Sequence, residues 1–506
     1  MKKIVSAIIL GLLLANAAIA QQISPLWKDF EDAKAQNKIP VLPDFSFAGY
    51  HFSELPIPSV SGHKYFDVTK FGAIPNDDKF DDDAIQKTID AAQKFNKPAV
   101  IFFPAGKFLI APDEDSTKQI RISQSNIILK GSGSGVGGTE IYQANKRIHG
   151  RQFLFKPSSI KTDKITEITQ NASRETFQIT VANASELKVG QDIIIQHRSE
   201  AFTKDYFSPQ VLRPQWIRLF GEKGGMLIFD IHTITKIKGN DVWFKNPIHL
   251  DIKLMNEGRW DILNYPSIEE CGVEDILFTS NWKNYPEDFI HHKNQIHDYA
   301  YEAVGLEFLK NSWIRNCEFK DWNEGIFIGS GYKISVLNTN FTGKKGHASI
   351  HARTGYGVLI KNCSFNGAQH HGAGTGYSAV NTVITACSLG KDQNFDIHSG
   401  QPHTTLFDNI TGGVFYNLGG PEPGYPHHGK NLVLWNFNHQ SEKEQYYDFW
   451  DQNKRRNHTI PYPIFVGFTS DKSVTFNHIG INESQGKAVF PTSLFEAQLK
   501  LRLSAK

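Results

Sequence analysis

Short apolar runs recur at a nearly constant interval between residues 310 and 412. The four clearest runs cover residues 313–319, 336–341, 358–365 and 383–389. They close on Phe319, Phe341, Phe365 and Leu389, which are 22, 24 and 24 positions apart. A period of this length is typical of a solenoid, in which each unit buries its apolar face only by stacking on its neighbours. Because the runs are short and the turns are polar and rich in Gly and Asn, the pattern predicts a coil of β-strands.

Small side chains occupy a second fixed place in the repeat, two residues before each closing position. They are Cys317, Thr339, Cys363 and Cys387. In a stacked coil these side chains are expected to lie above one another in the interior, about 4.8 Å apart from rung to rung. That spacing allows a Cys363–Cys387 disulfide, but free buried thiols that pack as small apolar groups are the favoured interpretation.

An ordered series of elements precedes the repeat. A strand at residues 66–73 is followed by an acidic loop, a helix from Ile85 to Phe95 and a strand at residues 99–106. This order and spacing resembles the N-terminal cap and first rung of the pectate-lyase-like superfamily of secreted β-helix proteins. The resemblance implies an all-β fold, a right-handed parallel β-helix (solenoid) with an N-terminal helical cap.

Two further segments depart from the coil pattern. Alternating strands within residues 163–250 predict a small β module inserted into the solenoid. The pattern changes again near Gly429, and the tail resembles a C-terminal domain of unknown function that follows the coil in Bacteroidetes relatives. The predicted organisation is a signal peptide (1–20), an N-terminal extension (21–64), the cap and first rungs (65–162), the inserted module (163–250), the main β-helix (251–428) and the last rungs with the C-terminal domain (429–506).

The first twenty residues have the features of a cleavable Sec signal peptide. Lys2 and Lys3 precede an apolar run to Leu14 and small residues up to Ala20, and this run is too short to span a bilayer. We therefore expect a secreted or periplasmic protein with no membrane span. Residues 1–20 hold two of the 54 basic residues and none of the 52 acidic ones, which leaves 52 of each. This balance does not favour a nucleic-acid partner. The sequence does not distinguish a monomer from a homo-oligomer.

Histidine is concentrated in the repeat region. Eight of the twenty histidines lie between residues 347 and 428. Because side chains alternate along a strand, His351 and Arg353 are expected on one face, and Asp396 and His398 on one face two rungs later. His371 opens the strand between them. If these strands face outward, the coil carries a stripe of imidazole, guanidinium and carboxylate groups.

Such a stripe suits β-elimination at a uronic acid. The reaction needs a group that neutralises the sugar carboxylate, a base near C5 and a donor that protonates the leaving oxygen. Arg353 is the candidate for the first role, and His351 or His398 for the second. His371, Tyr356 or Tyr377 are candidates for the donor. The predicted catalytic residues are His351, Arg353, His371 and His398.

Other polar and aromatic residues of the same region are expected to bind the substrate, an anionic polysaccharide. They are Lys344, Lys345, His347, Tyr356, His370, Tyr377, Asp396, His403, Tyr416 and His427. The string from Gly346 to His351, together with the later histidines, resembles a histidine-bearing surface of lyases in this superfamily. The aspartate cluster of the calcium-dependent pectate lyases has no match in this sequence, so no metal ligand is assigned and Ca²⁺ remains a candidate cofactor only.

Two other functions fit the fold. A glycoside hydrolase needs two facing carboxylates about 5–9 Å apart, and the candidates are Asp321 with Glu324, Asp392 with Asp396, and Asp408. That mechanism gives the excess of histidine no role. A non-catalytic β-helix that only binds carbohydrate is the third alternative. A product that absorbs in the ultraviolet distinguishes a lyase from a hydrolase, and binding without cleavage identifies the third.

Overall fold

The structure is a computed structural model that describes residues 21–112, 119–213, 216, 224–391, 393–414, 419–420, 422–450 and 459–505. The predicted signal peptide, residues 1–20, lies outside the described residues. Among the helices of the described ranges, none is long and apolar enough to cross a membrane.

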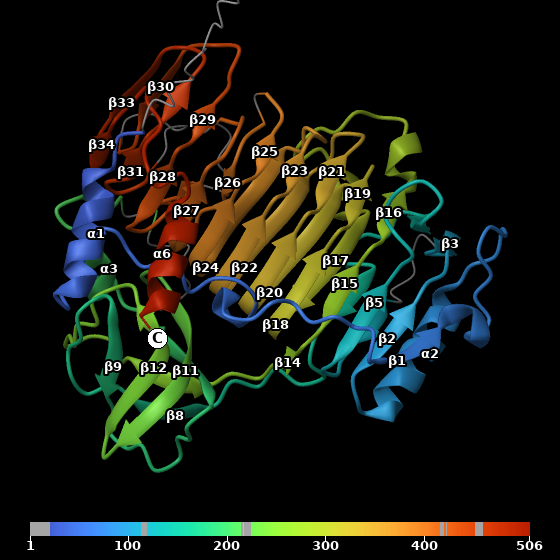
Figure 1. Cartoon of the computed structure of the whole chain (residues 1–506), viewed down its shortest axis with the longest axis horizontal. Helices are drawn as coiled ribbons and strands as arrows, with labels where there is room; N and C mark the ends of the chain where they lie inside the picture. The colour runs from blue at the N-terminus through green and yellow to red at the C-terminus, as the bar shows by residue number, and fades with distance from the viewer. Residues whose placement is uncertain are drawn as a thin grey trace, which may run out of the picture.

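Parallel strands stacked in register form the elongated main body (Figure 1). The largest sheet has 17 strands. They are β1 Lys64–Asp67, β2 Ala99–Phe102, β4 Ile120–Ile122, β5 Ile127–Lys130, β7 Phe153–Phe155, β14 Ile268–Glu269, β15 Gly272–Glu274, β17 Glu302–Glu307, β18 Leu309–Arg315, β20 Glu324–Leu337, β22 Ala348–Lys361, β24 His371–Thr385, β26 Asp396–Ile397, β27 His403–Asp408, β28 Leu432–Trp435, β31 Ile464–Val466 and β34 Ile481–Glu483.

A second parallel sheet has seven strands, and two short pairs lie near the C-terminal end. The seven are β3 Gly106–Ile110, β6 Thr139–Gln143, β16 Leu277–Ser280, β19 Glu318–Lys320, β21 Asn340–Thr342, β23 Ser364–Phe365 and β25 Ser388–Leu389. The pairs are β29 Asn438–His439 with β32 Thr469–Ser470, and β30 Gln445–Asp448 with β33 Val474–Asn477. The predicted all-β parallel β-helix is confirmed.

The closing residues of the repeat stack inside the coil, as the period predicts. Phe319 pairs in register with Phe341, Phe341 with Phe365, and Phe365 with Leu389. The ring centroids of Phe319 and Phe341 are 5.4 Å apart, and those of Phe341 and Phe365 are 5.0 Å apart. Phe278 extends this stack on the other side of Phe319, at 4.9 Å. The four cysteines are also buried, and all of them are free thiols.

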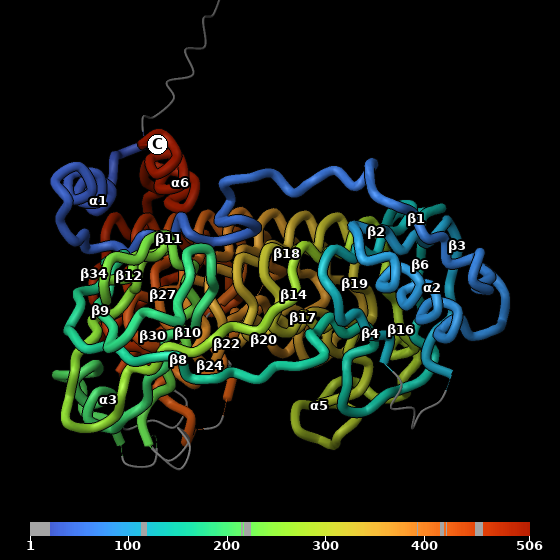
Figure 2. Tube along the Cα trace, turned by 90° about the horizontal axis from the view of Figure 1, so that it is seen from below, coloured from blue at the N-terminus to red at the C-terminus, as the bar shows by residue number. Residues whose placement is uncertain are grey.

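The inserted module is an antiparallel sheet packed against one side of the coil (Figure 2). Its strand order is β8-β13-β10-β11-β12-β9. The strands are β8 Lys164–Glu167, β9 Thr176–Thr180, β10 Asp192–His197, β11 Ile228–Lys238, β12 Asp241–Ile248 and β13 Asp261–Asn264. The module thus extends to Asn264, beyond the predicted end at residue 250, because β13 pairs with both β8 and β10.

The helices of the described ranges lie around the coil and in the inserted module. They are α1 Pro25–Ala35, α2 Asp82–Phe95, α3 Glu200–Phe207, α5 Gln295–Tyr299 and α6 Leu494–Ser504, with 3₁₀ turns η1 Tyr50–Ser53, η2 Val68–Phe71, η4 Asn281–Asn284 and η5 Glu422–Gly424. Helix α2 buries Ile85 and Ile89 in the main core near the first strands. Helices α1 and α6 lie on the same side of the coil (Figure 2) and share one apolar cluster with strand residues such as Val433.

Candidate functional site

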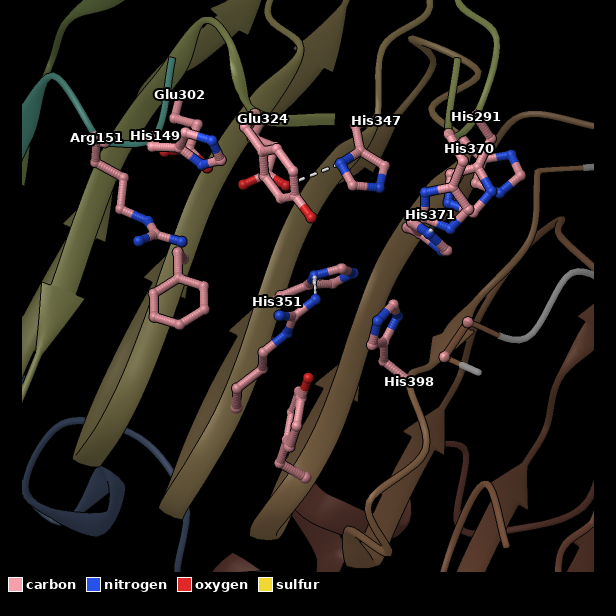
Figure 3. A pocket seen from close by; sticks show the side chains of 18 of the residues that line it. His149, Arg151, His291, Glu302, Glu324, His347, His351, His370, His371 and His398 are labelled. Carbon is pink, nitrogen blue, oxygen red and sulfur yellow. Dashed lines mark hydrogen bonds and ion pairs between the residues drawn. The ribbon is translucent and has the colours of Figure 1, made fainter. Parts of the chain in front are cut away.

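A cavity of about 1350 Å³ lies along the outer surface of strands β17, β20, β22 and β24 (Figure 3). On β22, Ile350 and Ala352 point into the core, whereas His351 and Arg353 line the cavity. His371 and His398 line the same cavity. The four residues predicted to be catalytic therefore share one outer wall of the coil, although they are far apart in the sequence.

Gly374 on β24 allows two functional side chains of neighbouring rungs to meet on this wall. In the strand register, His351 is followed by Gly374 and then by Asp396 on the next rungs. Because Gly374 has no side chain, His351 and Asp396 meet across it, with His351 Nε2 2.5 Å from Asp396 Oδ2. A Cβ atom at position 374 would lie 2.7 Å from Asp396 Cβ, which is closer than non-bonded carbon atoms approach.

Replacing Gly374 by alanine is therefore expected to displace Asp396 and to destabilise the protein by about 1–3 kcal/mol, the usual cost of overpacking. Calorimetric unfolding measures this loss. Gly62→Ala is the matched control, because a Cβ atom at position 62 meets open space. If the two variants unfold at the same temperature, the steric role of Gly374 is wrong.

Asp396 is fully buried and contacts three imidazoles. Besides His351, His398 Nδ1 lies 3.1 Å from Oδ2 and His371 Nδ1 lies 3.2 Å from Oδ1. Burial alone would raise the pKa of Asp396, but the surrounding imidazoles hold this pKa well below its ordinary value. Asp396 is thus an ionised carboxylate that orients the imidazoles around it.

His351 is held between two charged groups. Its Nδ1 accepts a hydrogen bond from Arg353 Nη2 at 3.1 Å, because a guanidinium only donates. The proton of the neutral ring therefore sits on Nε2, the nitrogen nearest to Asp396. Burial lowers the pKa of His351 to about 3, in spite of the neighbouring carboxylate. Both nitrogens are engaged, so His351 positions Arg353 and has no free lone pair for a substrate.

His398 is arranged differently. Its Nδ1 hydrogen-bonds Asp396, which places the proton on Nδ1 and leaves the lone pair of Nε2 for another partner. The side chain keeps 16% of its surface exposed, against 5% for His351 and 1% for His371. Of the three imidazoles around Asp396, His398 is the one that can act on a bound molecule.

A second group of histidines lies at one end of the cavity (Figure 3). His371 opens β24 and His370 directly precedes it, whereas His291 comes from the segment 281–299 between β16 and β17. His371 Nε2 lies 3.4 Å from His291 Nε2. Burial, followed by the charges of neighbouring histidines, lowers the pKa of His291 to about 3 and that of His370 to about 2. Both rings are therefore neutral near pH 7.

Two carboxyl groups lie at the other end. Glu302 and Glu324 occupy the same register position on β17 and β20 and line the cavity with Arg151. Burial, and then the charge of Glu324, raises the pKa of Glu302 to about 8. Burial alone would raise the pKa of Glu324 too, but His347, 3.0 Å from Glu324 Oε1, and Arg151 hold it well below its ordinary value. The pair thus holds one proton at neutral pH.

Metal-ligand groups are found in two places in the described ranges. They are His291, His370 and His371, and His351, Asp396 and His398. Both groups are rich in imidazole nitrogen, whereas Ca²⁺ prefers six to eight oxygen ligands. These two groups do not fit the calcium ion considered from the sequence.

Two of the predicted residues face the inserted sheet instead of the cavity. Tyr356 is fully buried and its hydroxyl bonds His249 Nε2 at 2.8 Å. Tyr356 pairs in register with Val380 on the next strand, and Val380 pairs with His403 on the strand after that. The Nε2 atom of His403 is 3.7 Å from the Asp230 carboxylate, in the inserted module. The predictions for Tyr356 and His403 were wrong, because the inserted module covers this row of the coil.

The predicted lysines are also outside the cavity lining. Lys344 Nζ donates to the Tyr285 carbonyl at 2.6 Å and lies over the Trp282 ring, so it holds the segment 281–299 in place. Lys345 is exposed at the surface. His347, His370, Tyr377 and His427 do line the cavity, and Tyr416 lies outside the described residues.

The carboxylate candidates are mostly structural. Asp408 accepts hydrogen bonds from the Thr385 hydroxyl and from a backbone N–H at the start of α6. Asp321 Oδ1 accepts a hydrogen bond from the backbone N–H of Lys344. Asp392 lies outside the described residues. Of these candidates, Glu324 lines the cavity, and Asp396 is buried directly behind the lining histidines. The partner of Glu324 is Glu302, which the sequence analysis missed although the two occupy equivalent places in adjacent rungs.

Other lining residues missed from the sequence come from outside the repeat. His149 and Arg151 precede β7, and His291 and His292 belong to the segment 281–299. The sequence did contain one indication of this part of the site, namely the adjacent His291 and His292 in a stretch rich in Trp and Tyr.

Two family models match parts of the chain. Residues 65–208 match "Rhamnogalacturonase A/epimerase, pectate lyase-like", and residues 368–506 match a domain of unknown function, DUF4955. No curated protein sequence matches. These two matches agree with the resemblances seen at the N-terminal cap and at the C-terminal tail.

Several solved structures are similar at low identity. The tailspike protein gp49 of Pseudomonas phage LKA1 is 12% identical, with 83% of this chain and 80% of that chain covered and a TM-score of 0.47. The A-module of the mannuronan C-5 epimerase AlgE4 of Azotobacter vinelandii is 11% identical, with coverages of 84% and 79% and a TM-score of 0.36. The family 28 exopolygalacturonase of Yersinia enterocolitica is 12% identical, with coverages of 84% and 67% and a TM-score of 0.35.

Proposed function

We propose that this chain, a pectate-lyase-like parallel β-helix protein with a C-terminal domain of unknown function, is a secreted polysaccharide lyase that cleaves a uronic-acid-containing polysaccharide by β-elimination. The observation that carries the proposal is the Asp396–His398 pair beside Arg353 on one wall of the cavity. It supplies an imidazole that is oriented through Nδ1 and stands next to a guanidinium.

Arg353 binds and neutralises the uronate carboxylate. Its Nη2 is fixed by His351 at 3.1 Å, and its guanidinium carbon lies 5.8 Å from the centre of the Phe327 ring and 5.2 Å from that of Tyr377. A guanidinium matches a carboxylate with two parallel hydrogen bonds. Neutralising the carboxylate stabilises the negative charge that develops next to C5 when its proton leaves.

His398 Nε2 takes the C5 proton. The electron pair of the C5–H bond forms the C4–C5 double bond, and the bond between C4 and the glycosidic oxygen breaks. The resulting imidazolium is stabilised by Asp396, 3.1 Å from Nδ1. The products are a chain with a new reducing end and a chain that ends in an unsaturated uronate.

Tyr377 is the donor to the leaving oxygen. Its side chain is 47% exposed, and it stands at a left-handed bend (φ 53°) in the middle of β24. This bend directs the ring outward beside Arg353, and the ring centroids of Tyr377 and His398 are 6.4 Å apart. His371 is less suited to this role, because its two nitrogens face Asp396 and His291.

The proposal predicts a product with ultraviolet absorbance. Purified protein is incubated with pectate, alginate, glucuronan and glycosaminoglycans while absorbance and reducing ends are followed together. With at least one polymer, absorbance and reducing ends are expected to rise in equal molar amounts. Reducing ends without absorbance would contradict a lyase.

Glu302 and Glu324 are the two carboxyl groups of the cavity that the second candidate, a glycoside hydrolase, would use. One carboxyl is protonated and the other is ionised near neutral pH, as an acid and a nucleophile or base require. A hydrogen bond joins the two side chains, however, so they are closer together than the about 5–9 Å of a glycosidase pair. If Glu302 is the acid, hydrolysis needs its proton and is lost as pH rises through about 8. Glu302→Gln then abolishes the release of reducing ends, whereas under the lyase proposal this variant keeps the ultraviolet-absorbing product.

A further inference from the structure

We propose that His291, His370 and His371 bind a divalent transition metal ion of the Zn²⁺ type at one end of the cavity. One ligand nitrogen of each residue lies within 4.8 Å of the other two. The inference concerns metal binding alone and does not depend on the reaction that the cavity carries out.

The distance between the ring nitrogens of His371 and His291 fits tetrahedral coordination. With Zn–N distances of about 2.0–2.1 Å, two ligands of a tetrahedral ion are about 3.3–3.4 Å apart. His371 Nε2 and His291 Nε2 are 3.4 Å apart, which is long for an N–H···N hydrogen bond and matches the ligand separation. The other histidine group is arranged differently, because His351 and His398 lie 2.5 and 3.1 Å from the same oxygen of Asp396. These nitrogens are paired with the carboxylate, so we do not propose a metal ion there.

A carboxylate stands behind one of the three proposed ligands. Asp396 Oδ1 lies 3.2 Å from His371 Nδ1, which favours the tautomer with its proton on Nδ1 and its lone pair on Nε2. A carboxylate behind a ligating histidine is a common feature of zinc sites. The His371 ring is itself 1% exposed, so its direction is fixed by packing.

The three ligands join two separate parts of the chain. His370 and His371 belong to the rung that begins β24, and His291 belongs to the segment 281–299. The rings of His291 and His370 are stacked with centroids 3.9 Å apart, so the segment already lies against the coil at this point. A metal ion between their nitrogens would hold the segment against the coil, and its fourth position would face the cavity, where water or an anionic oxygen of a ligand completes the coordination.

Metal analysis of the protein, purified without a histidine tag, tests this proposal. After removal of metal by a chelator, Co²⁺ is titrated and the visible absorbance of tetrahedral Co²⁺ is followed, and Zn²⁺ is measured by competition. We expect one ion per chain. His291→Ala and His370→Ala are expected to reduce affinity at least 100-fold, since each removes one of three protein ligands.

His292→Ala is the matched control, because His292 is adjacent in sequence but its Nδ1 is paired with Asp298 at 3.0 Å. It is expected to bind one ion as the wild type does. Thermal unfolding of the wild type with and without Zn²⁺ tests the site even if a variant fails to fold, because a ligand of the native state raises Tm. No bound ion and no change in Tm, or unchanged binding by His291→Ala, would overturn the proposal.

Discussion

His398→Ala is expected to lower kcat by about 10²–10⁴-fold, the usual contribution of a general base. The variant removes the imidazole whose Nδ1 pairs with Asp396 and whose Nε2 acts on C5. The initial rate of ultraviolet absorbance on the cleaved polymer measures this loss. KM is expected to change little, because the base acts on the transition state and contributes little to binding of the ground state.

The control for this variant is His478→Ala. His478 is half-exposed and paired with Asp448, with Nδ1 2.6 Å from the carboxylate, and it does not line the cavity. It is expected to retain wild-type kcat. A His398→Ala variant that keeps a wild-type circular dichroism spectrum and a wild-type kcat would remove His398 from the mechanism.

Arg353→Ala is expected to lower kcat/KM by about 10²–10³-fold, since it removes the cation that stabilises the developing charge. Arg353→Lys is expected to recover only part of this loss, because an ammonium keeps the charge but not the paired donors. Initial rates at low substrate concentration measure the effect.

A chemically modified substrate provides the control for Arg353. A methyl-esterified polymer has no carboxylate for the guanidinium to bind, so wild type and Arg353→Ala are expected to differ less on it than on the free acid. An equal loss on both substrates would indicate that Arg353 maintains the structure of the wall and does not recognise the carboxylate.

The sequence was sufficient to predict the coil because its repeat has a regular physical cause. Each rung buries one large side chain at the same place, so Phe319, Phe341 and Phe365 recur at the period of the coil and stack on one another. The same register brings residues two rungs apart onto one face. For this reason the repeat register and strand alternation together predicted that His351, Arg353 and His398 are close, on the condition that these strands face outward.

The rest of the site could not be predicted in this way because it depends on contacts outside the repeat. His291 reaches the cavity from the segment 281–299, whose path is set by packing such as the Trp282–Lys345 hydrogen bond at 2.9 Å. Tyr356 occupies an equally regular outward position, but the inserted sheet buries it. Periodicity predicts which side chains point outward, and it does not predict which outward surface another module covers.

In the proposed mechanism, the outer wall formed by His351, Arg353, His371 and His398 binds a uronate and removes its C5 proton. The most direct measurement is a crystal structure of the His398→Ala variant with an uncleaved uronate oligosaccharide. We expect the sugar carboxylate on the Arg353 guanidinium, with the C5 hydrogen directed at position 398. An oligosaccharide bound elsewhere on the coil, or one in the cavity with its carboxylate turned away from Arg353, would contradict the account.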